Sequence, residues 1–81
     1  AAPAADGLSG GTDLLALDEA LAILEQEDQR RYNVVMLRYF AGLSIEDTAA
    51  ALSISPATVK TDWTVARLRL FRLMQGEKGP A

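Results

Sequence analysis

The stretch from residue 44 to residue 63 reads SIEDTAAALSISPATVKTDW and contains two helix starts a short distance apart. Ser44 stands before two acids, and a serine that caps the amides of a first turn beside acidic residues is typical of a helix N-terminus. Ser55-Pro56 is a stronger start, because proline at the first helical position lacks only an N–H that would have no partner. The stretch therefore predicts two consecutive helices joined by a turn at Ser53-Ile54.

The second of these helices is predicted to run for about five turns. Apolar residues recur at intervals of three or four, the period of one helix face, at Val59, Trp63, Ala66, Leu70 and Leu73. Gly76 and Gly79-Pro80 then end the helix. If this stripe faces inward, the outer side of the first two turns presents Thr58, Lys60, Thr61 and Thr64. Asp62 lies among them, and we expect it on the surface or paired with a cation of the same chain.

Two further helices are predicted upstream. The first runs from Asp13 to about Glu27, because its leucines share one helical stripe, formed by Leu14, Leu17, Leu21 and Leu24. The second follows the acidic break at Glu27-Asp28 and carries Val34, Leu37 and Phe40 on one side. It is predicted to end at Gly42, since glycine readily adopts the left-handed conformation that closes a helix.

Together these patterns predict an all-α fold, a four-helix domain containing a helix-turn-helix with a long C-terminal recognition helix. We expect this domain to span residues 13–75. Residues 1–12 are rich in Ala and Gly and have no apolar period, so they are predicted to be a flexible lead-in or linker to a part upstream. Residues 76–81 are predicted to be a C-terminal tail.

The composition narrows the chemistry that is available. The 81 residues include no Cys and no His, which removes thiol nucleophiles, imidazole bases and the usual zinc ligands. The acids of the first helix follow one another along its length and form no calcium-loop pattern. We therefore predict a non-enzymatic domain with no catalytic residue, no metal and no cofactor. No apolar run could span a bilayer and no signal peptide is visible, so a cytoplasmic protein without a membrane partner is expected.

The net charge of −3 is unevenly distributed along the chain. Three Arg and nine acids precede Pro56, whereas five Lys or Arg and two acids follow from there. The last helix is therefore biased toward anionic partners, and charges more than about 8–10 Å away are largely screened. Thr hydroxyls can bond to base edges and Lys60 can reach a phosphate or a guanine, which fits the edge of a DNA groove. Arg67, one turn beyond Thr64, could bind the sugar–phosphate backbone of the DNA.

Structural roles compete with these functional ones. Trp63 shares the period of Val59 and is expected to be a core anchor. The arginines of the last helix could serve only to solvate its end, where the helix dipole also favours cations. Arg30 and Arg31 could pair with the acids of the break before them, Glu27 and Asp28.

The stretch LRYFAGLSIEDTA at residues 37–49, followed by SPATVK at 55–60 and by Ala66-Arg67, resembles region 4 of extracytoplasmic-function (ECF) sigma factors. The resemblance covers about residues 14–74. It implies a domain that recognises the minus-35 promoter element with its last helix and docks on the beta flap of RNA polymerase with its earlier helices. An anti-sigma factor is a further candidate partner.

The resemblance also assigns roles to single residues. The major-groove face matches Thr58, Lys60, Thr61 and Thr64, while Arg67 matches a common backbone contact and Arg38 an arginine that can touch phosphate. The chain departs from the pattern at Asp62, Thr64 and Val65, where the family often carries Arg or Ser. Its recognition face is therefore less cationic than usual.

Two other kinds of protein share parts of this pattern. The output domain of a response-regulator-type transcription factor has a similar helix-turn-helix skeleton, but usually a shorter recognition helix followed by a dimerising helix. A protein-interaction module that kept the fold and lost DNA binding would suit Asp62 and the net acidity. Salt-sensitive binding of duplex DNA would distinguish a sigma factor from an interaction module. Binding of a beta-flap peptide would distinguish a sigma factor from a response regulator.

Overall fold

The computed structural model describes residues 10–76, which form four helices in the predicted order. These are α2 (Gly10–Glu27), α3 (Gln29–Val35) with its short π-helical continuation η1 (Met36–Phe40), α4 (Ile45–Leu52) and α5 (Pro56–Met74). No strand occurs between residues 10 and 76, so the all-α fold is confirmed there. Residues 1–9 of the predicted lead-in and residues 77–81 of the predicted tail lie outside the described part of the chain.

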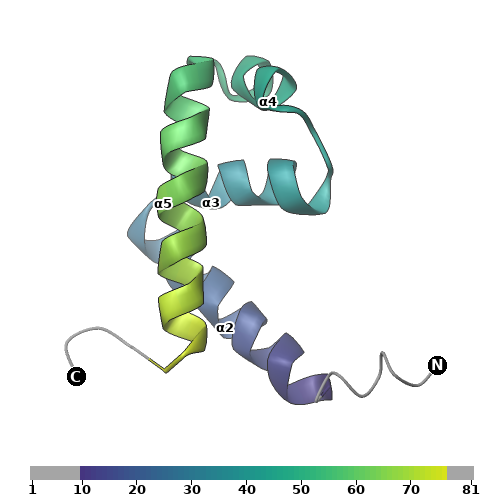
Figure 1. Ribbon diagram of the computed structural model, residues 1–81, viewed down its shortest axis with the longest axis vertical. Coiled ribbons are helices and arrows are strands. Elements are labelled where there is room, and N and C mark those ends of the chain that lie inside the picture. Colours follow the sequence, from purple (N-terminus) through teal and green to yellow (C-terminus); the bar gives the residue numbers. More distant parts are fainter. Residues whose placement is uncertain (1–9, 77–81) are drawn as a thin grey trace.

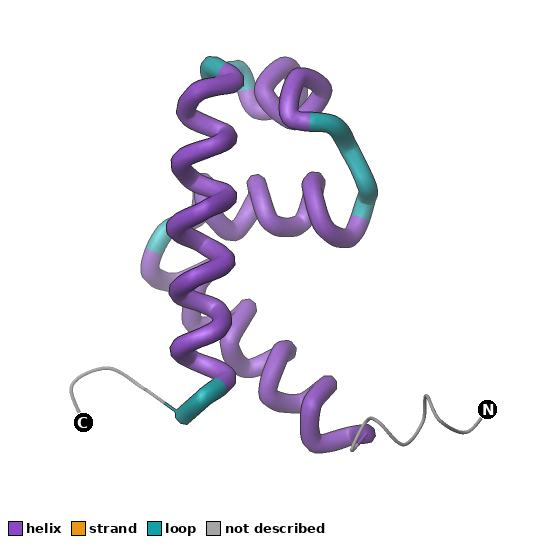
Figure 2. Tube along the Cα trace, in the orientation of Figure 1, coloured by secondary structure: helices purple, strands orange, loops and turns teal. Residues whose placement is uncertain are grey.

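Helix α5 is the central element of the fold. It packs against each of the other three helices. In Figure 1 it runs the length of the molecule, with α4 beside its start, α3 crossing near its middle and α2 lying toward its end. The helix-turn-helix formed by α4 and α5 is joined by a tight turn, drawn as the short loop at the top of Figure 2. The start of α5 therefore lies at one end of the molecule.

The core consists of two small apolar clusters. One contains the buried residues Leu24, Val35 and Ala66, and the other contains Val34, Ala49 and Val59. Trp63 packs against both clusters and so connects them. The predicted role of Trp63 as an anchor of the last helix is confirmed.

The predicted helix starts are confirmed by their hydrogen bonds. Ser44 Oγ accepts from the Asp47 amide at 2.9 Å, and Ser55 Oγ accepts from the Thr58 amide at 3.1 Å. The turn between the two helices passes through Ser53 in the left-handed conformation, with φ 58°. Gly42 also has a positive φ, 75°, as expected of a glycine that follows a helix.

The first predicted helix is longer and less buried than expected. Helix α2 begins at Gly10, three residues before the expected start at Asp13. Leu14 was expected in its buried stripe, but 67% of its surface is exposed. That expectation is wrong, because the buried residues of α2 lie in its later turns, at Ala20 and Leu24.

The second predicted helix changes its winding after Val35. The Ala41 amide bonds to the Met36 carbonyl at 3.0 Å, five residues back, which is the π-helical spacing. The wider turn displaces the following side chains around the helix axis. Phe40, expected on the same side as buried Val34, is therefore 49% exposed, and that expectation is wrong.

None of the helices between residues 10 and 76 combines the length and the apolar character that a membrane span requires.

Candidate nucleic-acid interface

The first turns of α5 are divided into an inner and an outer side. Val59 on the inner side is completely buried, as is Ala66 two turns later. Lys60, Thr61 and Thr64 on the outer side are exposed to solvent. Helix α5 therefore presents one ammonium and two hydroxyl groups on the surface that the sequence singled out.

Thr58 differs from the other three candidate residues of this face. It is half-buried, and its hydroxyl accepts a hydrogen bond from Ser55 Oγ at 2.9 Å. Thr58 thus belongs to the cap of α5 as well as to the edge of its outer surface.

Arg38 and Arg67, the other two candidate residues, both lie against Trp63. Their guanidinium carbons are 5.3 and 5.4 Å from the indole centroid, a cation–π distance. Arg38 is half-buried and its Nη1 donates to the Leu43 carbonyl at 2.7 Å. Its buried Nε has no hydrogen-bond partner among the described residues. Arg67 remains exposed, so the six candidates fall into two groups, one on the outer side of α5 and one around the indole.

Asp62 is only 1% exposed, although it lies on the first turns of α5. Arg30 holds its carboxylate through Nε at 2.6 Å and Nη2 at 3.1 Å, and Arg31 donates from Nε at 3.3 Å. The hydrogen bond from Arg30, helped by Arg31, lowers the pKa of Asp62 below its ordinary value although burial opposes this. The carboxylate is therefore ionised at neutral pH.

Of the two expected positions of Asp62, the pairing with a cation of the same chain is confirmed, and a surface position is excluded. The sequence did contain a signal, because Asp62 lies three residues after Val59 and four before Ala66. Its position therefore belongs to the inner face of the helix. An aspartate is buried in such a position only when it is paired, as Asp62 is with Arg30 and Arg31.

The other ion pairs also differ in part from the expected ones. Arg31 lies 3.6 Å from Asp28, as anticipated for this pair. Glu27 instead pairs with Arg69 of α5, whose Nε donates at 2.9 Å and whose Nη2 makes a second bond. This hydrogen bond lowers the pKa of Glu27. The pair connects the end of α2 to the second half of α5.

A shallow notch lies where the start of α3 meets the start of α5. It has a volume of about 290 Å³, and we call it the guanidinium notch. Its lining residues are Arg30, Arg31, Ala57, Thr58, Thr61 and Asp62. Two candidate residues of the outer face of α5, Thr58 and Thr61, thus line the same notch as the two arginines that bind Asp62.

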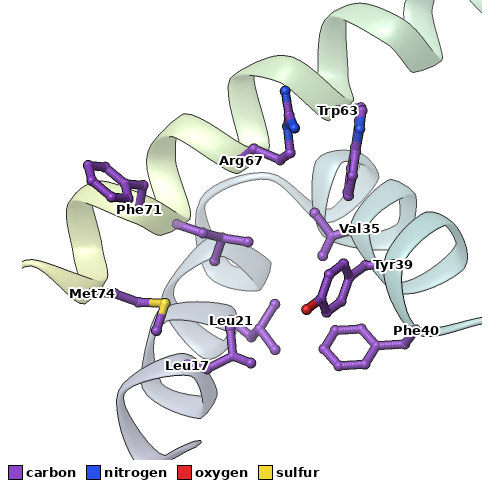
Figure 3. A pocket seen from close by; sticks show the side chains of 10 residues that line it. Leu17, Leu21, Val35, Tyr39, Phe40, Trp63, Arg67, Phe71 and Met74 are labelled. Atoms are coloured by element: carbon purple, nitrogen blue, oxygen red, sulfur yellow. The ribbon is translucent and has the colours of Figure 1, made fainter. Parts of the chain in front are cut away.

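A larger and mostly apolar groove of about 430 Å³ lies between α2, η1 and α5. Figure 3 shows Leu17 and Leu21 of α2 facing Tyr39 and Phe40 of η1, with Trp63, Phe71 and Met74 supplied by α5. Several of these side chains are strongly exposed, among them Tyr39 at 66% and Phe71 at 61%. We call this feature the apolar groove.

No cluster of acidic side chains that could hold a metal ion occurs in the part of the chain that the structure describes.

The fold and the two-sided α5 define the class of the protein, a helix-turn-helix domain of the kind that binds DNA. A family model described as ECF sigma factor matches residues 5–76, and the chain therefore belongs to the ECF sigma factor family. Neither a curated protein nor a solved structure matches the chain. Members of this family are non-enzymatic transcription factors, so the chain has a sigma-factor role in transcription initiation, with RNA polymerase and promoter DNA as partners.

Proposed function

We propose that the chain recognises the minus-35 element of a promoter by placing the start of α5 in the major groove. The observation that carries the proposal is the division of α5. Because Val59 and Ala66 are buried on its inner side, Lys60, Thr61 and Thr64 are held outward on consecutive turns of one rigid helix. A recognition helix contacts bases and phosphates through residues of this kind near its N-terminus.

The chemistry of this face suits a mixed role in base and backbone contact. Lys60 supplies a positive charge for a phosphate or a guanine, and the two threonines offer hydroxyl and methyl groups to base edges. Asp62 does not oppose this role, because its carboxylate is buried behind two guanidinium groups rather than directed at a phosphate. Arg38 and Arg67 are proposed as backbone contacts at the Trp63 side of the helix.

The experiment is enrichment of bound sequences from a random pool of DNA duplexes, followed by fluorescence anisotropy with the enriched duplex over a range of salt concentrations. Lys60→Ala should weaken binding and lower the salt slope by about one unit, since each lost phosphate contact removes about 0.9. Arg72→Gln is the control, because this exposed residue of the last turn of α5 loses the same charge far from the outer face. Absence of salt-dependent duplex binding by the unaltered chain would reject the proposal.

We also infer that the apolar groove receives the beta flap of RNA polymerase. What supports this step is the family's interaction with the polymerase together with the groove, an exposed apolar surface bordered by α2 and η1 as well as α5. Exposed apolar patches on small proteins commonly mark sites of protein contact. An anti-sigma factor stays a prediction, because no feature between residues 10 and 76 selects one.

The alternative of a protein-interaction module is supported by the same apolar groove. It does not explain why Lys60, Thr61 and Thr64 are presented together on the outer face of α5. It predicts binding of a flap peptide with no binding of duplex DNA, so the anisotropy experiment above decides between the two.

A further inference from the structure

The guanidinium of Arg30 is held along one edge only. Its Nε and Nη2 donate to the two oxygens of Asp62 at 2.6 and 3.1 Å. Its Nη1 has no partner among residues 10–76, and 51% of the Arg30 side chain is exposed. A side-on pair of this kind fixes the plane of the guanidinium and leaves a second edge with N–H donors facing the notch.

Arg31, in contrast, is engaged with two carboxylates. It donates to Asp62 at 3.3 Å and lies 3.6 Å from Asp28, and only 33% of its side chain is exposed. The charges of the two arginines and two aspartates therefore sum to zero, but the positive and negative groups lie on different sides of the cluster. The carboxylate of Asp62 is on the inside, and the available donors of Arg30 are on the outside.

We infer that Arg30 is a phosphate-binding group for the DNA backbone, positioned by Asp62 beside the recognition face of α5. The inference rests on the proposed function, because it assigns a backbone contact to the same duplex that α5 reads. Asp62 acts as a positioning residue, which holds the guanidinium plane and does not touch DNA.

The dimensions of the two partners place a phosphate near this notch. The major groove is about 12 Å wide, and a helix with its side chains is about 10–12 Å across. Groups immediately beyond the flank of an inserted helix therefore meet the sugar–phosphate backbone. The guanidinium notch lies on such a flank, because Thr58 and Thr61 of α5 form one of its walls.

The chemistry of the notch also favours a phosphodiester over a base. It lacks an aromatic ring among its lining residues, and its outward donors come from a planar guanidinium, whose geometry matches phosphate oxygens. Preorientation by Asp62 reduces the side-chain entropy that Arg30 would lose on binding. Phosphate contacts of this type fix the register of a protein on the duplex without reading sequence.

The test uses the full chain, the enriched duplex described above and an unrelated duplex of equal length, with anisotropy measured over a salt series. Arg30→Gln removes the donor charge but also disturbs the partner of a buried carboxylate. The double variant Arg30→Gln with Asp62→Asn therefore accompanies it, because it replaces the ion pair by amides and restores the net charge of the unaltered chain. Arg72→Gln is again the control for loss of one charge on an exposed arginine.

We expect Arg30→Gln and the double variant each to lower the salt slope by about one unit on both duplexes. Each should also weaken binding about tenfold, as expected for a lost hydrogen bond to a charged group. Arg72→Gln should keep the slope. Thermal unfolding followed by circular dichroism confirms that each variant is folded at the temperature of the measurement.

If the folded double variant keeps the slope and affinity of the unaltered chain while Lys60→Ala lowers both, Arg30 makes no phosphate contact and the inference is wrong. If the unaltered chain itself shows no salt-dependent binding, the proposed function fails, and the inference fails with it.

Discussion

At the scale of single residues, the buried carboxylate of Asp62 determines how the start of α5 is held. Its two partners, Arg30 and Arg31, lie 32 and 31 positions earlier in the chain. Carboxylates are almost never fully buried unless they are paired. The ion pairs therefore fasten the first turns of the recognition helix to the start of α3, while the apolar core fastens its middle.

This cluster predicts a dependence of stability on pH. The pKa of Asp62 is lower in the folded chain than in the unfolded one, mainly because of its hydrogen bond from Arg30. The contribution of the ionised Asp62 carboxylate to the free energy of unfolding is therefore complete above its unfolded-state pKa of about 3.9. It is lost as the pH falls through the lower pKa of the folded chain. Urea unfolding at a series of pH values should show the free energy of unfolding falling below about pH 4. Asp62→Asn should flatten this decline, and an equally steep decline in that variant would contradict the assignment.

Complete removal of the Asp62 carboxylate should lower the free energy of unfolding. Asp62→Ala leaves two guanidiniums without their shared partner, and breaking a fully buried pair costs about 3–5 kcal/mol. The half-exposed arginines can recover solvent, so we expect a smaller loss of about 2 kcal/mol. Chemical denaturation at pH 7 measures it, with Glu46→Ala on the exposed side of α4 as the control. A loss no larger than that of the control would show that the pairs contribute little.

The residues that sequence reasoning placed least well are those whose partners lie far away in the chain. For Asp62 the sequence left a surface position and a pair within the chain both open, because its arginines lie 32 and 31 positions earlier. Arg38 and Arg67 were matched to DNA contacts by family pattern, and no local spacing indicated that both would pack on Trp63. Long-range pairing of this kind has no short-range sequence signal.

At the scale of elements, the start of each helix was predictable where a capping side chain specifies it. Ser44 and Ser55 cap α4 and α5 through bonds that span three residues, which sequence alone reveals. The π-helical turn after Val35 was not predictable, since no glycine or proline marks it. It exposes Phe40 and so creates one side of the apolar groove.

The cap of the recognition helix provides the test at this scale. Ser55→Ala should lower the free energy of unfolding by about 1 kcal/mol, because the Thr58 amide loses its acceptor. Ser53→Gly is the matched control, since it also removes a hydroxyl but relieves a positive φ, and it should leave stability unchanged or raised. Urea denaturation of the three proteins measures both effects. Equal losses in the two variants would contradict the capping role.

At the scale of the whole molecule, the domain has two exposed surfaces for which we propose different partners. The outer face of the first turns carries Lys60, Thr61 and Thr64, whereas the apolar groove is formed with α2 and η1. Lys60, Thr61 and Thr64 do not line the groove, whereas Arg67, a proposed backbone contact, does, so the two surfaces meet at Arg67. This arrangement suits a protein that must contact promoter DNA and RNA polymerase at the same time.

The separation predicts variants that lose one partner and keep the other. Phe71→Ser in the groove should weaken binding of a beta-flap peptide about tenfold or more, because aromatic residues often dominate interfaces. It should leave stability within about 0.5 kcal/mol, since Phe71 is 61% exposed. Leu68→Ser is the control, an apolar residue of α5 that is 54% exposed and lies outside the groove lining. Calorimetric titration measures both, and equal weakening in the two variants would rule out the groove as the docking site.

The chain has one tryptophan, and its indole touches both apolar clusters and one wall of the groove. Light absorbed by that ring therefore reports on a single, known place in the molecule. A molecule bound in the groove, or a DNA backbone bound by Arg38 or Arg67, should alter the wavelength and intensity of its emission, whereas a ligand confined to Lys60, Thr61 and Thr64 should change them far less. The protein thus carries its own optical reporter, which distinguishes ligands that reach the indole from ligands confined to the outer face of α5 without an attached dye.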